Sequence, residues 1–220
     1  MSNLPDEVWR VGYVADPLGF VPHERSAFSH RFDDPDKHFR SLYAAQRPET
    51  CLREVLADVR PNAAALQAFV DRFSDEDGDP ADELPSFAVT AAWRRKNVLA
   101  AARIRIDHGD VLDLTDPEQR RDVEMRHADL LAEHGLDHLD LHEITTRRRV
   151  VTQTIAADAY TAGVAVICFP SSRDGQRCFA LLEGRAHLEP LGDPIPLVDP
   201  APSQLLQVCA EWNLPLEPTD

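Results

Sequence analysis

Residues 164–169 of this 220-residue chain have the sequence VAVICF, a nearly continuous apolar run with the length of a β-strand. Such a run is typical of a strand that is buried on both faces of a sheet. A helix predicted over residues 149–162 precedes the run and ends at Gly163, and a polar stretch that begins at Ser171 follows it. The segment therefore predicts the most deeply buried strand of the fold, which is entered from a helix and left through a polar loop.

Weaker patterns on both sides of this segment predict further elements. Strands are expected over residues 8–14, 27–32, 39–45, 87–93, 98–106, 111–114, 136–144, 179–182 and 186–188. Helices are expected over residues 48–59, 62–73 and 203–212, and from a capping box at residues 115–118 to near Gly135. Because strands and helices interleave without regular βαβ alternation, we expect an α+β fold with a mixed or antiparallel central sheet and flanking helices.

Length and composition indicate one globular domain over residues 1–220, with an exposed acidic loop at residues 74–85. The formal net charge is −15, from 23 Lys and Arg against 38 Asp and Glu. A surface this negative repels nucleic acid and anionic membranes, although a single Arg in a cleft can still bind a small anionic substrate. The chain shows neither a secretory signal pattern nor a run of about 18 apolar residues, so we expect a cytoplasmic protein.

The four cysteines are Cys51, Cys168, Cys178 and Cys209, and they form no CxxC pair. In a reducing compartment this spacing favours small buried hydrophobic residues over disulfides or a zinc site. Cys168 and Cys178 could still face each other on neighbouring strands.

The helix expected over residues 48–59 has a clear core face. Pro48 suits the first helical position, because it lacks the N–H group that would have no partner there. The apolar face consists of Cys51, Leu52, Val55, Leu56 and Val59. Glu54 lies about 60° beyond the edge of this face, at ~100° per residue. It is thus predicted at the border between core and solvent, where a cleft residue would lie.

Three other polar residues also adjoin apolar strand patterns: Arg31, Tyr43 and Ser171. They lie in the segments HRF, LYAAQRPETCLREV and VVTQTIAADAYTAGVAVICFPSSRDGQRCFALLE, of which the second also contains Glu54. These segments, in this order, resemble the RES domain family over residues 27–188.

The resemblance implies an ADP-ribosyltransferase-like fold and an enzyme that consumes NAD as a substrate, with no further cofactor and no metal. It also implies a toxin of a bacterial toxin–antitoxin pair, whose antitoxin carries a helix-turn-helix DNA-binding domain. A homodimer or a toxin–antitoxin hetero-oligomer is compatible with it, and direct contact with nucleic acid or membrane is not expected. Matched by motif, the catalytic residues are Arg31, Glu54 and Ser171, with Tyr43 at the substrate; Ser172 leaves the choice of serine open.

The chemistry of NAD cleavage suits these residue types. Breaking the nicotinamide–ribose bond develops positive charge on the ribose, which a carboxylate such as Glu54 stabilises. Arg31 matches phosphate oxygens, with Arg173 and Arg177 as further candidates. Tyr43 offers a flat ring on which nicotinamide can stack. The acceptor of ADP-ribose stays open between water, phosphate and a protein side chain, so the enzyme is a glycohydrolase, a phosphorylase or an ADP-ribosyltransferase.

Two alternatives remain. The chain could be a catalytically idle module that keeps the fold to bind a partner. It could also be a metal-dependent hydrolase built on His127, His134, His138, His142 and Glu143, since histidines four residues apart share one helical face. Gly135 argues against the second alternative, because the helix is expected to end there. Taken singly, Arg31 also has an ordinary interpretation as a surface ion pair with Asp33 or Asp34.

Overall fold

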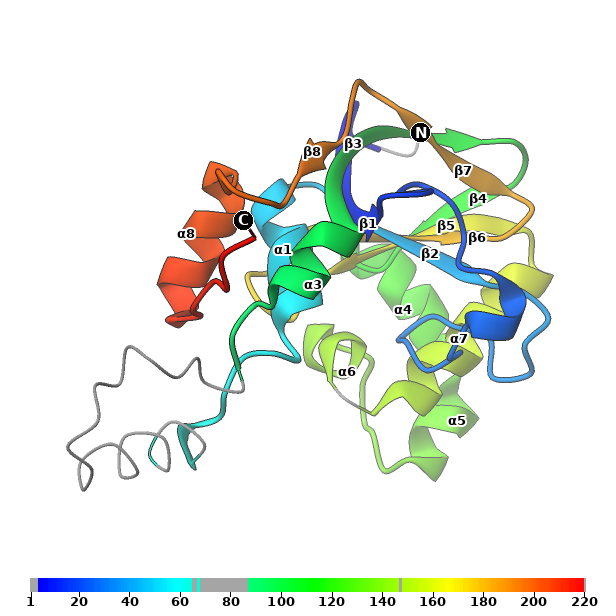
Figure 1. The fold of residues 1–220 in the computed structure, drawn as a ribbon. Coiled ribbons are helices and arrows are strands. Elements are labelled where there is room, and N and C mark those ends of the chain that lie inside the picture. The colour runs from blue at the N-terminus through cyan, green and yellow to red at the C-terminus, as the bar shows by residue number, and fades with distance from the viewer. Residues whose placement is uncertain (1–3, 65–66, 68–86, 147, 220) are drawn as a thin grey trace.

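A central β-sheet dominates the computed structural model, which describes residues 4–64, 67, 87–146 and 148–219 (Figure 1). The strands are β1 (Val8–Tyr13), β2 (Ser41–Ala45), β3 (Asn97–Ile106), β4 (Asp110–Asp113), β5 (Val164–Pro170), β6 (Arg177–Leu182), β7 (Ala186–Pro190) and β8 (Ile195–Pro196). In the described residues they form an eight-stranded sheet of order β4-β5-β6-β2-β1-β3-β7, with β8 paired to β3. β4 and β5 are parallel and the other pairs are antiparallel, so the sheet is mixed, with β4 at one edge and β7 and β8 sharing the other.

Helices flank this sheet. They are η1 (His23–Arg25), α1 (Pro48–Leu56), α3 (Ala91–Lys96), α4 (Pro117–Arg126), α5 (Ala128–Glu133), α6 (Leu141–Thr145), α7 (Arg149–Thr161) and α8 (Ser203–Trp212). α1 contacts β1 and β2, α6 and α7 contact β5, and α8 packs against α1. Within the described part of the chain, no helix combines the length and the apolar character needed to cross a membrane. The predicted α+β fold with a mixed sheet and flanking helices is confirmed.

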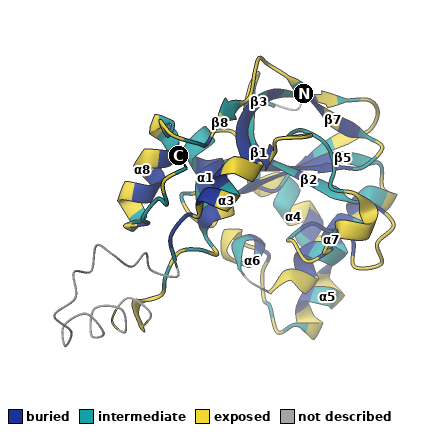
Figure 2. Cartoon of the chain, in the orientation of Figure 1, coloured by how far each residue is buried: buried dark blue, intermediate teal, exposed yellow. Residues whose placement is uncertain are grey.

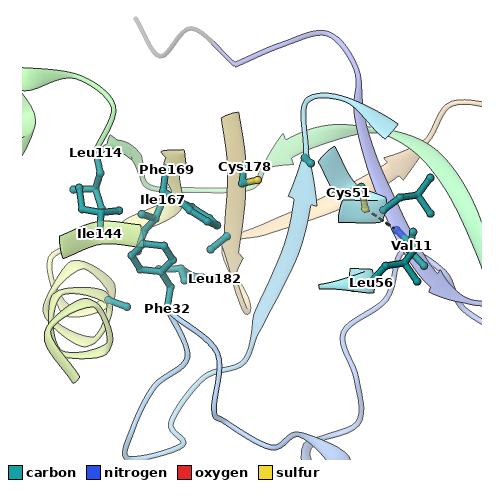
Figure 3. Close-up of a cluster of buried hydrophobic side chains, with 14 of the residues drawn as sticks. Val11, Phe32, Cys51, Leu56, Leu114, Ile144, Ile167, Phe169, Cys178 and Leu182 are labelled. Carbon is teal, nitrogen blue, oxygen red and sulfur yellow. Dashed lines mark hydrogen bonds between the residues drawn. The ribbon is translucent and has the colours of Figure 1, made fainter. Parts of the chain in front are cut away.

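β5 has the burial that its sequence predicts, since six of its seven residues are buried (Figure 2). Its side chains alternate between two cores. Ile167 and Phe169 join the larger core, under the helices (Figure 3). Val166 and Cys168 join a smaller core on the other face of the sheet. A strand with apolar neighbours on both faces needs a continuous apolar sequence, which explains why the run 164–169 has no polar interruption.

α1 begins at Pro48, as predicted, and buries Cys51, Leu52 and Leu56 against the sheet. The Val11 backbone N–H donates a hydrogen bond to Cys51 Sγ at 3.0 Å, which ties the helix to β1 (Figure 3). Val55 is 39% exposed, so its assignment to the core face is wrong. The helix therefore presents a narrower apolar face than its sequence indicates.

Three predicted strands are wrong, and local capping explains two of them. Residues 91–96 form α3, in which the Thr90 side chain accepts a hydrogen bond from the Trp93 backbone N–H. Residues 141–145 form α6, which the Asp140 side chain caps in the same manner. Residues 27–32 form no strand, and Phe28 has a positive φ of 48°. A short side chain that accepts hydrogen bonds from the first turn favours the start of a helix there. It does so even where the following residues alternate between apolar and polar as in a strand.

The helix expected from residue 115 is shifted and divided. Its N-cap is Asp116 rather than Thr115, and a break at His127 separates α4 from α5. α8 has the predicted bounds. The predicted acidic loop 74–85 lies outside the described residues, as does most of the predicted helix 62–73.

All four cysteines are buried and free, as predicted. Burial raises the pKa of Cys51 and of Cys209 to about 11 and that of Cys168 to about 12, and it also raises the pKa of Cys178. The β5–β6 register pairs Cys168 with Phe179 and Cys178 with Phe169. The two cysteines are therefore one residue out of register and point to opposite faces of the sheet, not toward each other.

The C-terminal residues are held by one buried arginine. Arg94 of α3 is 1% exposed. Its guanidinium donates hydrogen bonds to the carbonyl oxygens of Leu197 at 2.8 Å and Glu217 at 2.7 Å. The same guanidinium pairs with the Asp199 carboxylate at 2.5 Å. Arg94 thus joins the segment before α8 to the segment after it, and we call residues 197–199 and 214–219 the C-terminal strap.

Candidate active site

Glu54 and Ser171 lie in direct contact. Glu54 is on α1, and Ser171 directly follows the buried strand β5. The Ser171 hydroxyl donates a hydrogen bond to Glu54 Oε1 at 2.5 Å and accepts one from the Arg173 backbone N–H at 3.0 Å. Ser171 is 3% exposed, whereas Glu54 is partly exposed. The pair is a carboxylate at the border of the core whose orientation is set by a buried hydroxyl.

The second serine of the PSSR motif lies elsewhere. Ser172 is exposed, and its side chain makes no hydrogen bond to any residue that the structure describes. Arg173 is exposed as well. Of the two serines that the sequence leaves open, the structure brings Ser171 to Glu54.

Tyr43 lies on β2, on the same face of the sheet as α1. Its hydroxyl donates a hydrogen bond to Asp33 Oδ1 at 3.1 Å and accepts one from the Phe32 backbone N–H at 2.9 Å. Burial and the neighbouring negative charge of Asp33 raise the pKa of Tyr43 well above its usual value. The edge-on neighbours of its ring are His30 and Phe169, with centroids at 5.6 and 6.4 Å. Tyr43 is therefore a neutral phenol in a fixed orientation.

Arg31 is bound to backbone rather than to acidic side chains. Its guanidinium donates hydrogen bonds to the carbonyl oxygens of Ile144, of Thr145 at 2.9 Å and of Thr146 at 2.7 Å, at the end of α6. Asp33 and Asp34, its presumed surface partners, are themselves buried. The predicted surface ion pair is therefore wrong, and Arg31 fastens its loop to the junction between α6 and α7.

Electrostatic effects place Arg31 near Glu54. Burial lowers the pKa of Arg31, and the negative charge of Glu54 partly opposes that change. The positive charges of Arg149 and Arg173 lower it further. Arg149 and Arg173 thus lie close enough to Arg31 to act on its charge, in a protein whose net charge is −15. This local excess of positive charge suits an anionic ligand.

We expect Arg31→Gln to loosen the α6–α7 junction, because Gln cannot donate to three carbonyl oxygens. Losing hydrogen bonds from a charged donor should lower the free energy of unfolding by about 2 kcal/mol. Hydrogen exchange should quicken at residues 144–153. Arg148→Gln is the matched control, since Arg148, at the same junction, donates to a single described residue, through the His134 carbonyl. Equal exchange in both variants would contradict this function of Arg31.

Arg177 is the predicted site residue that the structure does not bring to the others. Its guanidinium binds Asp113 Oδ2 at 2.9 Å and Cys168 Sγ at 3.2 Å, on the face of the sheet opposite Cys178 and α1. Side chains alternate along β6, so a residue next to Cys178 points away from Glu54. Closeness to Ser171 in the sequence gave no information about this face.

Two residues beside the site, Asp33 and Arg149, were not predicted as functional. Asp33 is 3% exposed and binds Tyr43, and it also accepts a hydrogen bond from the His30 backbone N–H at 2.8 Å. Arg149 donates to the Ser29 carbonyl near Arg31. The segment HRFDD, in which two acidic residues follow Phe32, is the signal that could have indicated Asp33.

The histidines proposed as an alternative metal site do not gather. His127 pairs with Asp158 at 3.5 Å and His138 with Glu124 at 3.4 Å. Among the residues that the structure describes, the one group with ligand atoms within 4.8 Å of one another is Asp34, Asp36 and His38. Both Asp34 oxygens there already accept backbone N–H groups of that turn. The histidine constellation therefore finds no support in the geometry.

Comparison with known proteins identifies the family. The sequence model of the RES domain matches residues 7–200, well over half of the chain. A similar solved structure is the crystal structure of the M. tuberculosis MbcT–MbcA toxin–antitoxin complex, with 15% identity, coverage of 93% of this chain and 89% of that chain, and a TM-score of 0.52. At this identity the likeness shows a shared fold. The search of curated proteins found no match. On the extent of the family match, this chain belongs to the RES domain family.

Proposed function

We propose that this protein consumes NAD by cleaving its nicotinamide–ribose bond. The C–N bond breaks with its electron pair passing to the nicotinamide ring nitrogen. A bond then forms between the ribose carbon and an oxygen of the acceptor, which loses a proton. Water, inorganic phosphate and a protein side chain are the three acceptor classes under the proposal.

The contact of Glu54 with Ser171 is the observation that carries the proposal. A carboxylate next to the ribose stabilises the positive charge that develops as nicotinamide leaves. Such stabilisation depends on a preorganised charge, and the hydrogen bond from the Ser171 hydroxyl at 2.5 Å fixes the carboxylate before substrate binds. Ser171 is in this proposal a positioning residue, and Glu54 is the catalytic one.

The proposed binding residues follow from the surrounding charges. Tyr43 would contact nicotinamide, while Arg31, Ser172 and Arg173 would lie along the phosphates. Arg31 already donates to three carbonyl oxygens, so its part is to hold its loop against the α6–α7 junction and to add positive potential. Arg177, on the opposite face, receives no support from its position.

We further propose that the protein is a toxin whose antitoxin covers this site. The support is the RES family membership and the fold shared with a structure described as a toxin–antitoxin complex. In this proposal the antitoxin supplies a helix-turn-helix domain, and contact with DNA belongs to the antitoxin, because a chain with net charge −15 repels phosphate backbones.

Nicotinamide release from NAD by the purified, partner-free protein tests the activity. The assay is run with and without inorganic phosphate, and the mass of the nucleotide product identifies the acceptor. We expect release, with ADP-ribose, its phosphate adduct or a modified protein as the second product. No release under any of these conditions, from protein shown to be folded by circular dichroism, would refute the proposed reaction.

A further inference from the structure

A second, polar pocket lies beside the Glu54–Ser171 pair, between α1, α8 and the loop that joins β5 to β6. Its volume is about 560 Å³, within the range of small-molecule sites. The wall consists of Arg47, Glu49, Arg53, Arg173, Asp174, Gln176, Gln207, Glu211 and Trp212. None of the four residues Arg31, Tyr43, Glu54 and Ser171 lines it. We call this cavity the α1–α8 pocket.

One arginine of the α1–α8 pocket is already neutralised. Arg53 donates to Asp174 Oδ2 at 2.8 Å and to both carboxylate oxygens of Glu211. Burial would raise the pKa of Asp174, but hydrogen bonds from Thr50 and Gln176 and the charge of Arg53 outweigh it and lower that pKa. The hydrogen bond from Arg53 likewise lowers the pKa of Glu211. These ion pairs stay ionised and hold α1, α8 and the β5–β6 loop together along one side of the pocket.

Two other arginines of the pocket have no such partner. The side chains of Arg47 and Arg173 make neither a hydrogen bond nor an ion pair with the residues that the structure describes. Both side chains are exposed, so their guanidinium groups are open to solvent at the mouth of the pocket. Two unpaired guanidinium groups at one cavity therefore leave donors available to an anionic ligand, with the geometry that suits phosphate.

We propose that the α1–α8 pocket binds a nucleoside phosphate. Arg47 and Arg173 would hold the phosphate. The Arg60 guanidinium lies over the Trp212 ring at 4.9 Å from its centroid, so the base would stack on the other face of that ring.

The Glu49 carboxylate would accept hydrogen bonds from ribose hydroxyls or from the edge of the base. The Gln207 amide can both accept and donate such hydrogen bonds. Because the lining carries as many carboxylates as arginines, it suits a nucleoside phosphate better than inorganic phosphate alone.

The pocket and the Glu54–Ser171 pair share one structural element. The Arg173 backbone N–H donates to the Ser171 hydroxyl, and the Arg173 side chain lines the pocket and acts electrostatically on Arg31. A ligand in the pocket would therefore contact the loop that carries Ser171, the hydrogen-bond partner of Glu54. If NAD is the substrate, the occupant is its ADP half; this assignment rests on the proposed function, whereas nucleoside phosphate binding does not.

Calorimetric titration of the full chain with AMP and with ADP-ribose tests the proposal. We expect saturable 1:1 binding to the wild type and much weaker binding of inorganic phosphate. Arg47→Gln and Arg173→Gln should each weaken AMP binding by about 10-fold, the usual effect of losing a charge-assisted hydrogen bond. Arg121→Gln, an exposed arginine of α4 outside the pocket, should bind as the wild type does. Absence of AMP and ADP-ribose binding to folded wild type, or equal AMP binding by wild type and Arg47→Gln, would overturn the proposal.

Kinetics of NAD cleavage separate the two sources of the nucleotide. If the pocket holds the ADP half of NAD, Arg47→Gln raises KM for NAD and leaves KM unchanged for nicotinamide mononucleotide, which lacks the adenylate. If the nucleotide is a separate molecule, Arg47→Gln loses AMP binding with KM for NAD unchanged. Nicotinamide release without AMP or ADP-ribose binding would refute the pocket alone, and binding without release would refute the proposed reaction alone.

Discussion

Replacing Glu54 by Gln should lower the rate of nicotinamide release from NAD by at least about 100-fold, the scale for losing a positioned catalytic group. The variant keeps the size of the side chain, and its amide oxygen can still accept the hydrogen bond that Ser171 donates at 2.5 Å. It lacks the negative charge that would stabilise the developing positive charge on the ribose. The measurement is the initial rate of release at saturating NAD.

Glu133→Gln provides the control for this experiment, because Glu133 is an exposed residue at the end of α5. Its rate should equal that of the wild type. Both variants should unfold at the same temperature as the wild type, which separates loss of chemistry from loss of structure. A Glu54→Gln variant that releases nicotinamide as fast as the wild type would exclude Glu54 as the catalytic carboxylate.

Replacing Arg94 by Gln should give the largest loss of stability, on the order of 3 kcal/mol in the free energy of unfolding. A shorter neutral side chain cannot keep the hydrogen bonds to the buried Leu197 carbonyl, the part-buried Glu217 carbonyl and the Asp199 carboxylate, and an unsatisfied buried group costs roughly 1–3 kcal/mol. The C-terminal strap would lose the residue that joins its two parts. Urea denaturation, followed by circular dichroism, measures the change.

Arg95 is the matched control, since it is the next residue of α3 but is exposed. Its guanidinium donates one hydrogen bond, to the Thr219 carbonyl at 2.9 Å. Arg95→Gln should change the free energy of unfolding by less than about 0.5 kcal/mol, as is usual for surface substitutions. Equal effects of the two substitutions would show that the buried contacts of Arg94 do not hold the strap.

The elements that the sequence predicts well are those with long, uniform patterns. β5 and α8 are found as expected, because a continuous apolar run and a ten-residue amphipathic stretch each suit one kind of structure. α3 and α6 contain six and five residues, too few to repeat a helical pattern. Their starts depend on the capping residues Thr90 and Asp140, and this signal competes with an alternation that also suits a strand.

The residues of the candidate site also differ in how well the sequence predicts their positions and partners. Glu54 at a helix border and Ser171 at a strand end were predictable, because local periodicity fixes both positions. The partners of Arg31 were not predictable, since the three carbonyl oxygens that it binds lie more than 100 residues further along the chain. The separation of Arg177 from the site depends on strand register, which becomes known only when β5 and β6 are paired.

The edges of the sheet affect whether the protein aggregates at high concentration. An open sheet edge is a template onto which a strand of another molecule can add, and this is a common route to aggregation. β4 has four residues, and its register with β5 is irregular between Asp110 and Val111. β7 ends at Pro190 and carries the polar side chains of His187 and Glu189. β8, which shares the β7 edge, consists only of Ile195 and Pro196. Short length, irregular pairing, charge and proline all hinder strand addition, so both edges of the sheet disfavour fibril formation.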